Sequence, residues 1–162
     1  MNTFKEQLLT AILISMCMMM TSVTHAGERY AKQKVVYHIN YDQPKKQAGA
    51  LRNIQNHINA VGADNLDLKV VLHGNGLALL LDPDSLQKLN KFKHANANDS
   101  MTAKIDSLKD QGVSFNVCAN TVRGRNVDLK HDLYDVDNEG VVPSGVAEVA
   151  RLQAMGYSYI KP

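Results

Sequence analysis

Apolar and polar positions follow two different periods along most of this chain. Residues 34–41, 66–72 and 113–118 are rich in β-branched, aromatic and leucine side chains, which is typical of buried strands. Between the first two runs, apolar residues recur every three or four positions over 44–61, which predicts an amphipathic helix opened by Pro44 and ended by Gly62. The same helical spacing covers 101–111 and 145–155, and Ser144 is a favourable N-cap for the latter.

Shorter segments complete the predicted order of elements. Residues 77–81 predict a buried helical turn, 82–92 a helix that begins after Asp82, and 119–125 a short helical turn closed by Gly124. Residues 129–134 and 157–160 predict two further short strands. Strands that alternate with helices imply an α/β fold, with a mainly parallel sheet and helices on both faces.

The first 26 residues have a pattern of their own. Lys5 lies in a short polar start, an almost uncharged run covers 8–23, and residues 24–26 end the segment with a small-x-small sequence. This arrangement is typical of a secretory signal peptide, and the apolar run is shorter than the roughly 20 residues of a membrane span. We therefore expect residues 1–26 to be a cleaved signal peptide and residues 27–162 to be one periplasmic domain without a membrane anchor. An uncleaved anchor is the alternative.

The composition of the chain limits the classes of molecule that we expect it to bind. The net charge is only +2, there is no tryptophan, and aromatic residues make up 6% of the 162 residues. This balance argues against nucleic acid and against a base-stacking platform. Cys17 lies in the leader, so Cys118 is left as a single cysteine. In an exported protein such a cysteine forms an intermolecular bond, is a reactive thiol, or is buried and inert.

Ligands of open parallel sheets bind beyond the carboxyl ends of the strands. That rule selects residues 40–42, 73–76 and 118–121. If a helix starts just after Cys118, its free N–H groups lower the pKa of the thiol, and Arg123 or Arg125 adds to this effect where either folds back. The alternative is a buried structural cysteine, because cysteine packs as a small hydrophobe.

The segment His73-Gly74-Asn75-Gly76 is the second candidate site. Glycines after a strand allow the backbone N–H groups to form an anion-binding nest, although a tight turn with a structural histidine is the alternative. Leu79 stands where a dinucleotide-binding loop needs its third glycine. No metal or cofactor is expected, because the histidines lack zinc-site spacing and Val146 replaces the closing acidic ligand of a calcium loop that would begin at Asp135.

The segment Val117-Cys118-Ala119-Asn120-Thr121-x-Arg123-Gly124 resembles the DsrE/DsrF family of sulfur-relay-type proteins. The resemblance extends to residues 35–38, 71–74, 142–146 and 152–157, and the closing segment looks most like an exported branch of the family. It implies a three-layer α/β/α domain with a five-stranded, mainly parallel sheet, assembled as a trimer or hexamer. In the sulfur-carrying members a cysteine at the position of Cys118 takes up sulfur as a persulfide and passes it on.

Three hypotheses follow. The first is a periplasmic sulfur carrier without a cofactor, in which Cys118 holds a persulfide received from a donor protein or compound and passed to an acceptor. In that carrier Asn120 and Thr121 shape the surroundings of the sulfur, with Arg123 nearby, and His73, Gly74 and Asn75 line the pocket across a subunit contact. The second is a non-enzymatic oligomeric module that binds a small anion while Cys118 is inert. The third is a thiol-dependent redox enzyme, which needs a partner to supply the resolving cysteine.

Overall fold

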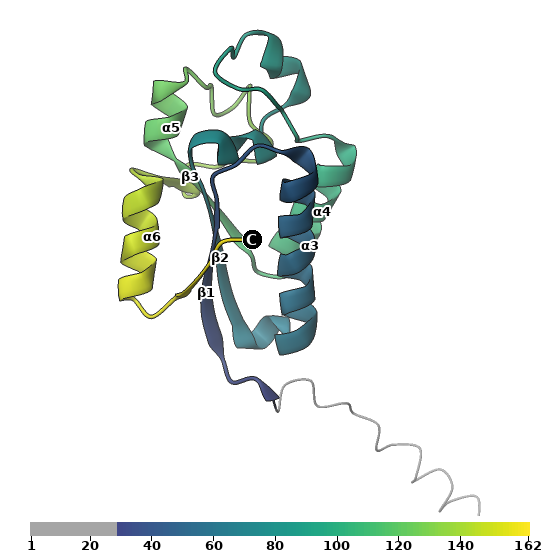
Figure 1. Cartoon of the computed structure of the whole chain (residues 1–162), viewed down its shortest axis with the longest axis vertical. Helices are drawn as coiled ribbons and strands as arrows, with labels where there is room; N and C mark the ends of the chain where they lie inside the picture. The colour runs from purple at the N-terminus through teal and green to yellow at the C-terminus, as the bar shows by residue number, and fades with distance from the viewer. Residues whose placement is uncertain (1–28) are drawn as a thin grey trace, which may run out of the picture.

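The computed structural model describes residues 29–162 (Figure 1). The predicted signal peptide, residues 1–26, lies outside the described residues. Among the residues that are described, no helix has the length and apolar character needed to cross a membrane. The elements run in the order β1 (Gln33–Ile39), α3 (Pro44–Val61), η1 (Ala63–Asn65), β2 (Leu66–Leu72), η2 (Gly74–Leu79), η3 (Pro83–Gln87), α4 (Asp99–Asp110), β3 (Ser114–Cys118), α5 (Ala119–Gly124), β4 (Val141–Val142), α6 (Gly145–Ala154) and β5 (Ser158–Ile160), where η denotes a 3-10 helix.

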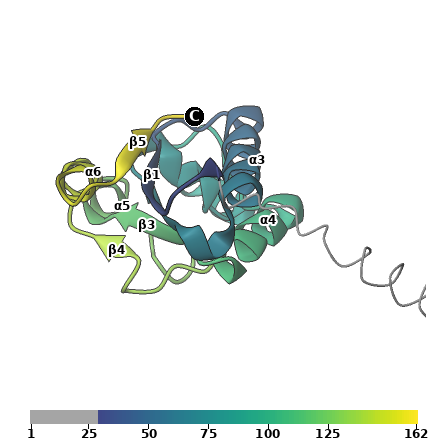
Figure 2. The same ribbon diagram turned by 90° about the horizontal axis from the view of Figure 1, so that it is seen from below.

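The strands form one five-stranded sheet in the order β4-β3-β2-β1-β5. All neighbouring strands are parallel. Helices α3 and α4 cover one face, and α6 with the short α5 lies on the other (Figures 1 and 2). The predicted three-layer α/β/α architecture with a parallel sheet is therefore confirmed.

The main core fills the space between the sheet and α3 with α4. Apart from Gln33 at the start of β1, the residues of β1, β2 and β3 that point to this side are apolar. They pack on Leu51 and Ile54 of α3 and on Ile105 of α4. A second, smaller cluster lies under α6, where Val36 and Val71 contact Val149, Leu152 and Tyr157. The two faces of the sheet thus carry very different amounts of apolar packing.

Local signals set the ends of the helices as expected. Pro44 occupies the first turn of α3, and Gly62 ends that helix with a φ of 88°, a conformation that glycine adopts without strain. The Ser144 side chain accepts a hydrogen bond from the Ala147 N–H at the start of α6.

Two sequence-based expectations were wrong. The helix predicted over 82–92 is a 3-10 helix that ends at Gln87, and the carboxylate of Asp82 accepts a hydrogen bond from the Asp84 N–H in its first turn. Residues 129–134 form no strand beyond one isolated bridge between Leu81 and Leu133. The fifth strand is instead β4.

The aspartates of this region explain the second error. Asp128 accepts hydrogen bonds from the N–H groups of Lys130 and His131, and Asp132 accepts one from the Asp128 N–H. Side-chain bonds of this kind compete with a strand ladder for the backbone donors. The segment therefore turns instead of extending.

Candidate functional site

Three side chains that can exchange protons or act as nucleophiles, His38, His73 and Cys118, share one face at the carboxyl edge of the sheet. The register pairs Val71 of β2 with His38 of β1 and with Asn116 of β3. Since successive strand residues point to opposite faces, His73 and Cys118, each two residues further on, point to the same side as Val71 and Asn116. This is the side that α6 covers (Figure 1).

The sulfur of Cys118 lies between the starts of two helices. Cys118 is the N-cap residue of α5, and Gly145 is the first residue of α6. A Cβ atom added to Gly145 would lie 2.8 Å from the Cβ of His73 and 3.2 Å from the Cβ of Cys118. Only a residue without a side chain allows α6 to begin so close to the thiol.

Burial and hydrogen bonding act in opposite directions on the thiol. Burial is the largest single influence and raises the pKa of Cys118. Hydrogen bonds from the Gly145 N–H, the Thr121 hydroxyl, and the N–H groups of Thr121 and Asn120 outweigh it, so that this pKa lies below its usual value. The side chain is 5% exposed and belongs to neither apolar cluster of the described core.

Thr121 connects the two predicted segments of the site. Its hydroxyl oxygen accepts a hydrogen bond of 2.8 Å from the Gly74 N–H, and the same hydroxyl is one of the groups that lower the pKa of the Cys118 thiol. The turn after β2 is thereby held to the turn after β3. The sequence placed Gly74, Cys118 and Thr121 at one edge, and the structure brings them together.

The side chains of the predicted residues Arg123, Asn120 and Asn75 have hydrogen-bond partners other than the sulfur. The Arg123 guanidinium donates to the side chain of Asn120 at 2.6 Å. Asn75 accepts a hydrogen bond from Arg125 at 2.7 Å, and the Arg125 guanidinium stacks 4.4 Å from the ring centroid of Phe92. Neither arginine is among the groups that shift the pKa of Cys118, so the activation of the thiol comes from N–H and O–H donors.

Three residues of this edge were missed from the sequence. His38 bonds to His73 through their Nε2 atoms at 2.7 Å, and its Nδ1 atom lies 2.8 Å from the Tyr159 hydroxyl. The alternation along the first strand, combined with a parallel register, is the signal that could have placed His38 on the face of His73. Gly145 lies in the segment 142–146 that resembles the family, but the sequence analysis assigned it no role.

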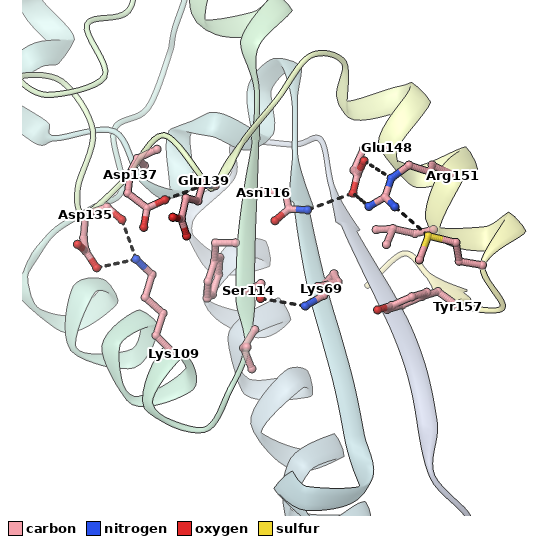
Figure 3. Close-up of a pocket in the computed structure, with 16 residues that line it drawn as sticks. Lys69, Lys109, Ser114, Asn116, Asp135, Asp137, Glu139, Glu148, Arg151 and Tyr157 are labelled. Carbon is pink, nitrogen blue, oxygen red and sulfur yellow. Dashed lines mark hydrogen bonds and ion pairs between the residues drawn. The ribbon is translucent and has the colours of Figure 1, made fainter.

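A separate hollow of about 670 Å³ lies on the same face, beside β3 (Figure 3). Its charges are largely paired within the protein: Lys109 with Asp135 at 2.6 Å, and Arg151 with Glu148 at 2.6 Å. Asn116, which lines the hollow, donates to Glu148 at 3.4 Å. Cys118 does not line this hollow, so the two sites are distinct.

Metal binding has no support from side-chain clusters. Within residues 29–162, no three or more histidine, cysteine, aspartate or glutamate side chains are grouped so as to hold an ion. His38 and His73 engage each other directly, with a nitrogen-to-nitrogen distance suited to a hydrogen bond.

Comparisons with known proteins agree with this architecture. The chain is similar in structure to MTH1491 from Methanobacterium thermoautotrophicum, a protein of unknown function, with a TM-score of 0.61 and 27% identity over 80% of this chain and 99% of the other. It also shares its fold with the ychN protein from E. coli, at a TM-score of 0.57 and 17% identity over the same shares of the two chains. No curated protein matches the sequence. The model of the DsrE/DsrF-like family matches residues 33–162, and the chain belongs to that family.

Proposed function

We propose that this protein is a periplasmic sulfur carrier that holds sulfur on Cys118 as a persulfide and delivers it to an acceptor thiol. The observation that carries the proposal is the set of hydrogen-bond donors around the sulfur, which lowers the pKa of the thiol in spite of its burial. A thiolate is the reactive form of cysteine in sulfur exchange. Membership of the DsrE/DsrF-like family agrees with a sulfur-relay role.

Each step of the proposed cycle is an exchange at sulfur. The Cys118 thiolate attacks the terminal sulfur of a donor persulfide R–S–SH, a new S–S bond forms, and the donor leaves as the thiolate R–S⁻. In delivery, an acceptor thiolate attacks the outer sulfur and Cys118 leaves as a thiolate. Neither step needs an external oxidant or reductant, because the sulfane sulfur moves with its oxidation state unchanged. The donors around Cys118 favour both steps, since they stabilise the thiolate as nucleophile and as leaving group.

Access and assembly belong to the same proposal. The Cys118 side chain is only 5% exposed, so a donor reaches it at the carboxyl edge, where the turns after β2 and β3 meet. A homo-oligomer, a trimer or a hexamer, would complete the pocket at this edge. Donor or acceptor proteins would then approach along the same edge.

Burial of Cys118 favours one competing function. A thiol that is 5% exposed is compatible with a module in which the same N–H donors hold a small anion and the sulfur takes no part in chemistry. The two functions differ in whether Cys118 forms a covalent adduct.

Intact mass after incubation with polysulfide or thiosulfate tests the proposal. The wild type is expected to gain sulfur that dithiothreitol removes, and Cys118→Ser is expected to gain none. Cys17 lies in the predicted signal peptide, so both proteins are compared in the mature form, residues 27–162, in which Cys118 is the only cysteine. Sulfide alone serves as a second control, because it contains no sulfane sulfur. A wild type that gains no sulfur from either donor, and whose folded thiol resists alkylation, would leave the anion-binding module as the function.

A further inference from the structure

Two hydrogen bonds link the side chains of Tyr159, His38 and His73 into a series that starts at the surface. Tyr159 on β5 lies with its hydroxyl 2.8 Å from Nδ1 of His38 on β1. Nε2 of His38 lies 2.7 Å from Nε2 of His73, the residue that follows β2. The two imidazole rings are 4.7 Å apart between centroids and inclined by 24°. Tyr159 and His38 lie on the neighbouring strands β5 and β1, and His73 directly follows the next strand, β2, so the sheet holds the three side chains in line.

The number of protons available decides which group donates in each of these two hydrogen bonds. A bond between two imidazole nitrogens at 2.7 Å contains one proton, and a neutral imidazole carries one N–H. An imidazole nitrogen is a far better base than a phenol oxygen, so Tyr159 donates its O–H to Nδ1 of His38. The proton of His38 then sits on Nε2 and is donated to Nε2 of His73, which leaves the proton of His73 on Nδ1.

Both rings are neutral near pH 7. Burial, followed by the charges of His73 and Lys161, lowers the pKa of His38 to about 4. Burial and then Lys161 also lower the pKa of His73. Besides each other, the groups that face the two histidines are the Tyr159 hydroxyl, the Lys161 ammonium group and the Cys118 thiol next to Gly145.

His73, the last residue of this hydrogen-bonded series, is a neighbour of Cys118 at the carboxyl edge of the sheet. The Cβ atoms of His73 and Cys118 are both within 3.2 Å of the point where a side chain on Gly145 would begin. Nδ1 of His73 has no hydrogen-bond partner among residues 29–162. A neutral N–H donor at this place suits an anion bound at the carboxyl edge.

We propose that Tyr159 and His38 are positioning residues, which fix His73 as a neutral Nδ1–H donor for an anionic reagent or sulfur anion approaching Cys118. The inference rests on the proposed function for the identity of that anion, a persulfide or polysulfide. The assignment of the three residues does not depend on it. Neutral donors bind an anion without adding a full positive charge that would hold the product in the site.

The tautomers can be observed directly by ¹⁵N NMR of histidine-labelled protein. In the wild type we expect the proton of His73 on Nδ1 and that of His38 on Nε2. Tyr159→Phe removes the hydroxyl that fixes this order, and both signals should shift toward a tautomer mixture. Tyr30→Phe is the matched control, because Tyr30 is exposed to 40% and Tyr159 to 41%. A wild-type His73 protonated on Nε2 would overturn the proposal.

Two alkylating reagents of similar size provide the functional test. Iodoacetate is an anion and iodoacetamide is neutral, and both react with the Cys118 thiolate. In Tyr159→Phe the ratio of the iodoacetate rate to the iodoacetamide rate should fall about fivefold, the equivalent of one hydrogen bond of about 1 kcal/mol. The ratio should be unchanged in Tyr30→Phe.

The outcomes separate the two proposals. A purely structural role for Tyr159 would slow both reagents equally, and an unchanged ratio would equally refute the positioning role. If the ratio falls while no sulfur donor adds mass to Cys118, the positioning residues stand and the sulfur carrier does not. His38→Gln should reproduce the fall in the ratio, since it breaks the same series at its centre.

Discussion

The two faces of the sheet differ in what their strand residues do. On the face under α3 and α4, the inward residues of the three long strands other than Gln33 are apolar, including Tyr37 of β1, Leu68 of β2 and Phe115 of β3. On the face under α6, Val36 and Val71 are the apolar residues of the same strands. The other side chains there are polar or bear the thiol, and with His73, which follows β2, they are Lys34, His38, Asp67, Lys69, His73, Ser114, Asn116 and Cys118. The face under α3 and α4 therefore supplies most of the stability, and the face under α6 holds the reactive thiol and the two paired histidines.

This division has a physical cause. Two helices of 18 and 12 residues cover the apolar face, whereas α6, with 10 residues, is the main cover of the other. Polar groups that are incompletely covered stay hydrogen-bonded to one another, as in the bond between Lys69 and Ser114 at 3.1 Å. A face that contributes less to the core tolerates a thiol and two histidines at its rim.

Neighbouring residues on β2 test the comparison most strongly. Leu68 is 1% exposed and points to the α3 face, so Leu68→Ala should lower the free energy of unfolding by about 2 to 5 kcal/mol. Lys69, with a side chain 28% exposed, points to the α6 face, and Lys69→Ala should cost about 1 kcal/mol or less. Urea denaturation measures both. Equal losses would show that the two faces contribute alike.

The close approach of α6 to the thiol gives the next largest effect. Gly145→Ala places a Cβ atom 2.8 Å from His73, and the strain should cost about 1 to 3 kcal/mol. The displaced Gly145 N–H no longer supports the thiolate, so the pKa of Cys118 rises and alkylation near neutral pH slows about fivefold.

Gly124→Ala is the matched control for that variant, because no heavy atom lies within 4 Å of the position its Cβ would take. It should leave both the urea midpoint and the alkylation rate close to those of the wild type. If Gly145→Ala behaves in the same way, the helix start is not what activates the thiol.

The smallest expected effect is a dependence of stability on pH. The pKa of His38 is lowered from 6.5 to about 4 by burial, so the unfolded chain binds more protons between these values. The free energy of unfolding should therefore fall as the pH drops from about 6.5 to about 4. Partial exposure limits the contribution of His38 to about 1 kcal/mol.

His38→Gln should flatten this slope in urea titrations across the same pH window. His131→Gln, at a side chain 75% exposed, should keep the slope of the wild type. A slope that survives in His38→Gln would assign the pH dependence to other groups, such as His73 and His57, whose pKa values are also lowered by burial.

The apolar face was predictable from sequence because its signals are local and redundant. Alternation over 113–118, helical spacing over 44–61 and the stop at Gly62 each point to the same elements, and the structure agrees with all of them. The failures at 82–92 and 129–134 lie where aspartate side chains capture backbone N–H groups, an effect that periodicity does not report.

The site on the other face was only partly predictable, for a different reason. Cys118 and Thr121 are close in sequence, and the rule on strand ends selected them together with Gly74. Tyr159 and His38 are separated by 121 positions, and their contact depends on β5 pairing beside β1. Strand order is a property of the whole sheet, so no local pattern announces such a contact.

The hydrogen bond between Tyr159 and His38 depends on strand β5 staying paired with the sheet. Strand β5 is an outermost strand, held to β1 over only the three residues from Ser158 to Ile160. Outer strands of this length open far more often than the whole protein unfolds. Each opening withdraws the Tyr159 hydroxyl from His38 while the core beneath α3 stays intact. Amide exchange at β5 would therefore report how often the bond between Tyr159 and His38 is broken while the rest of the protein stays folded.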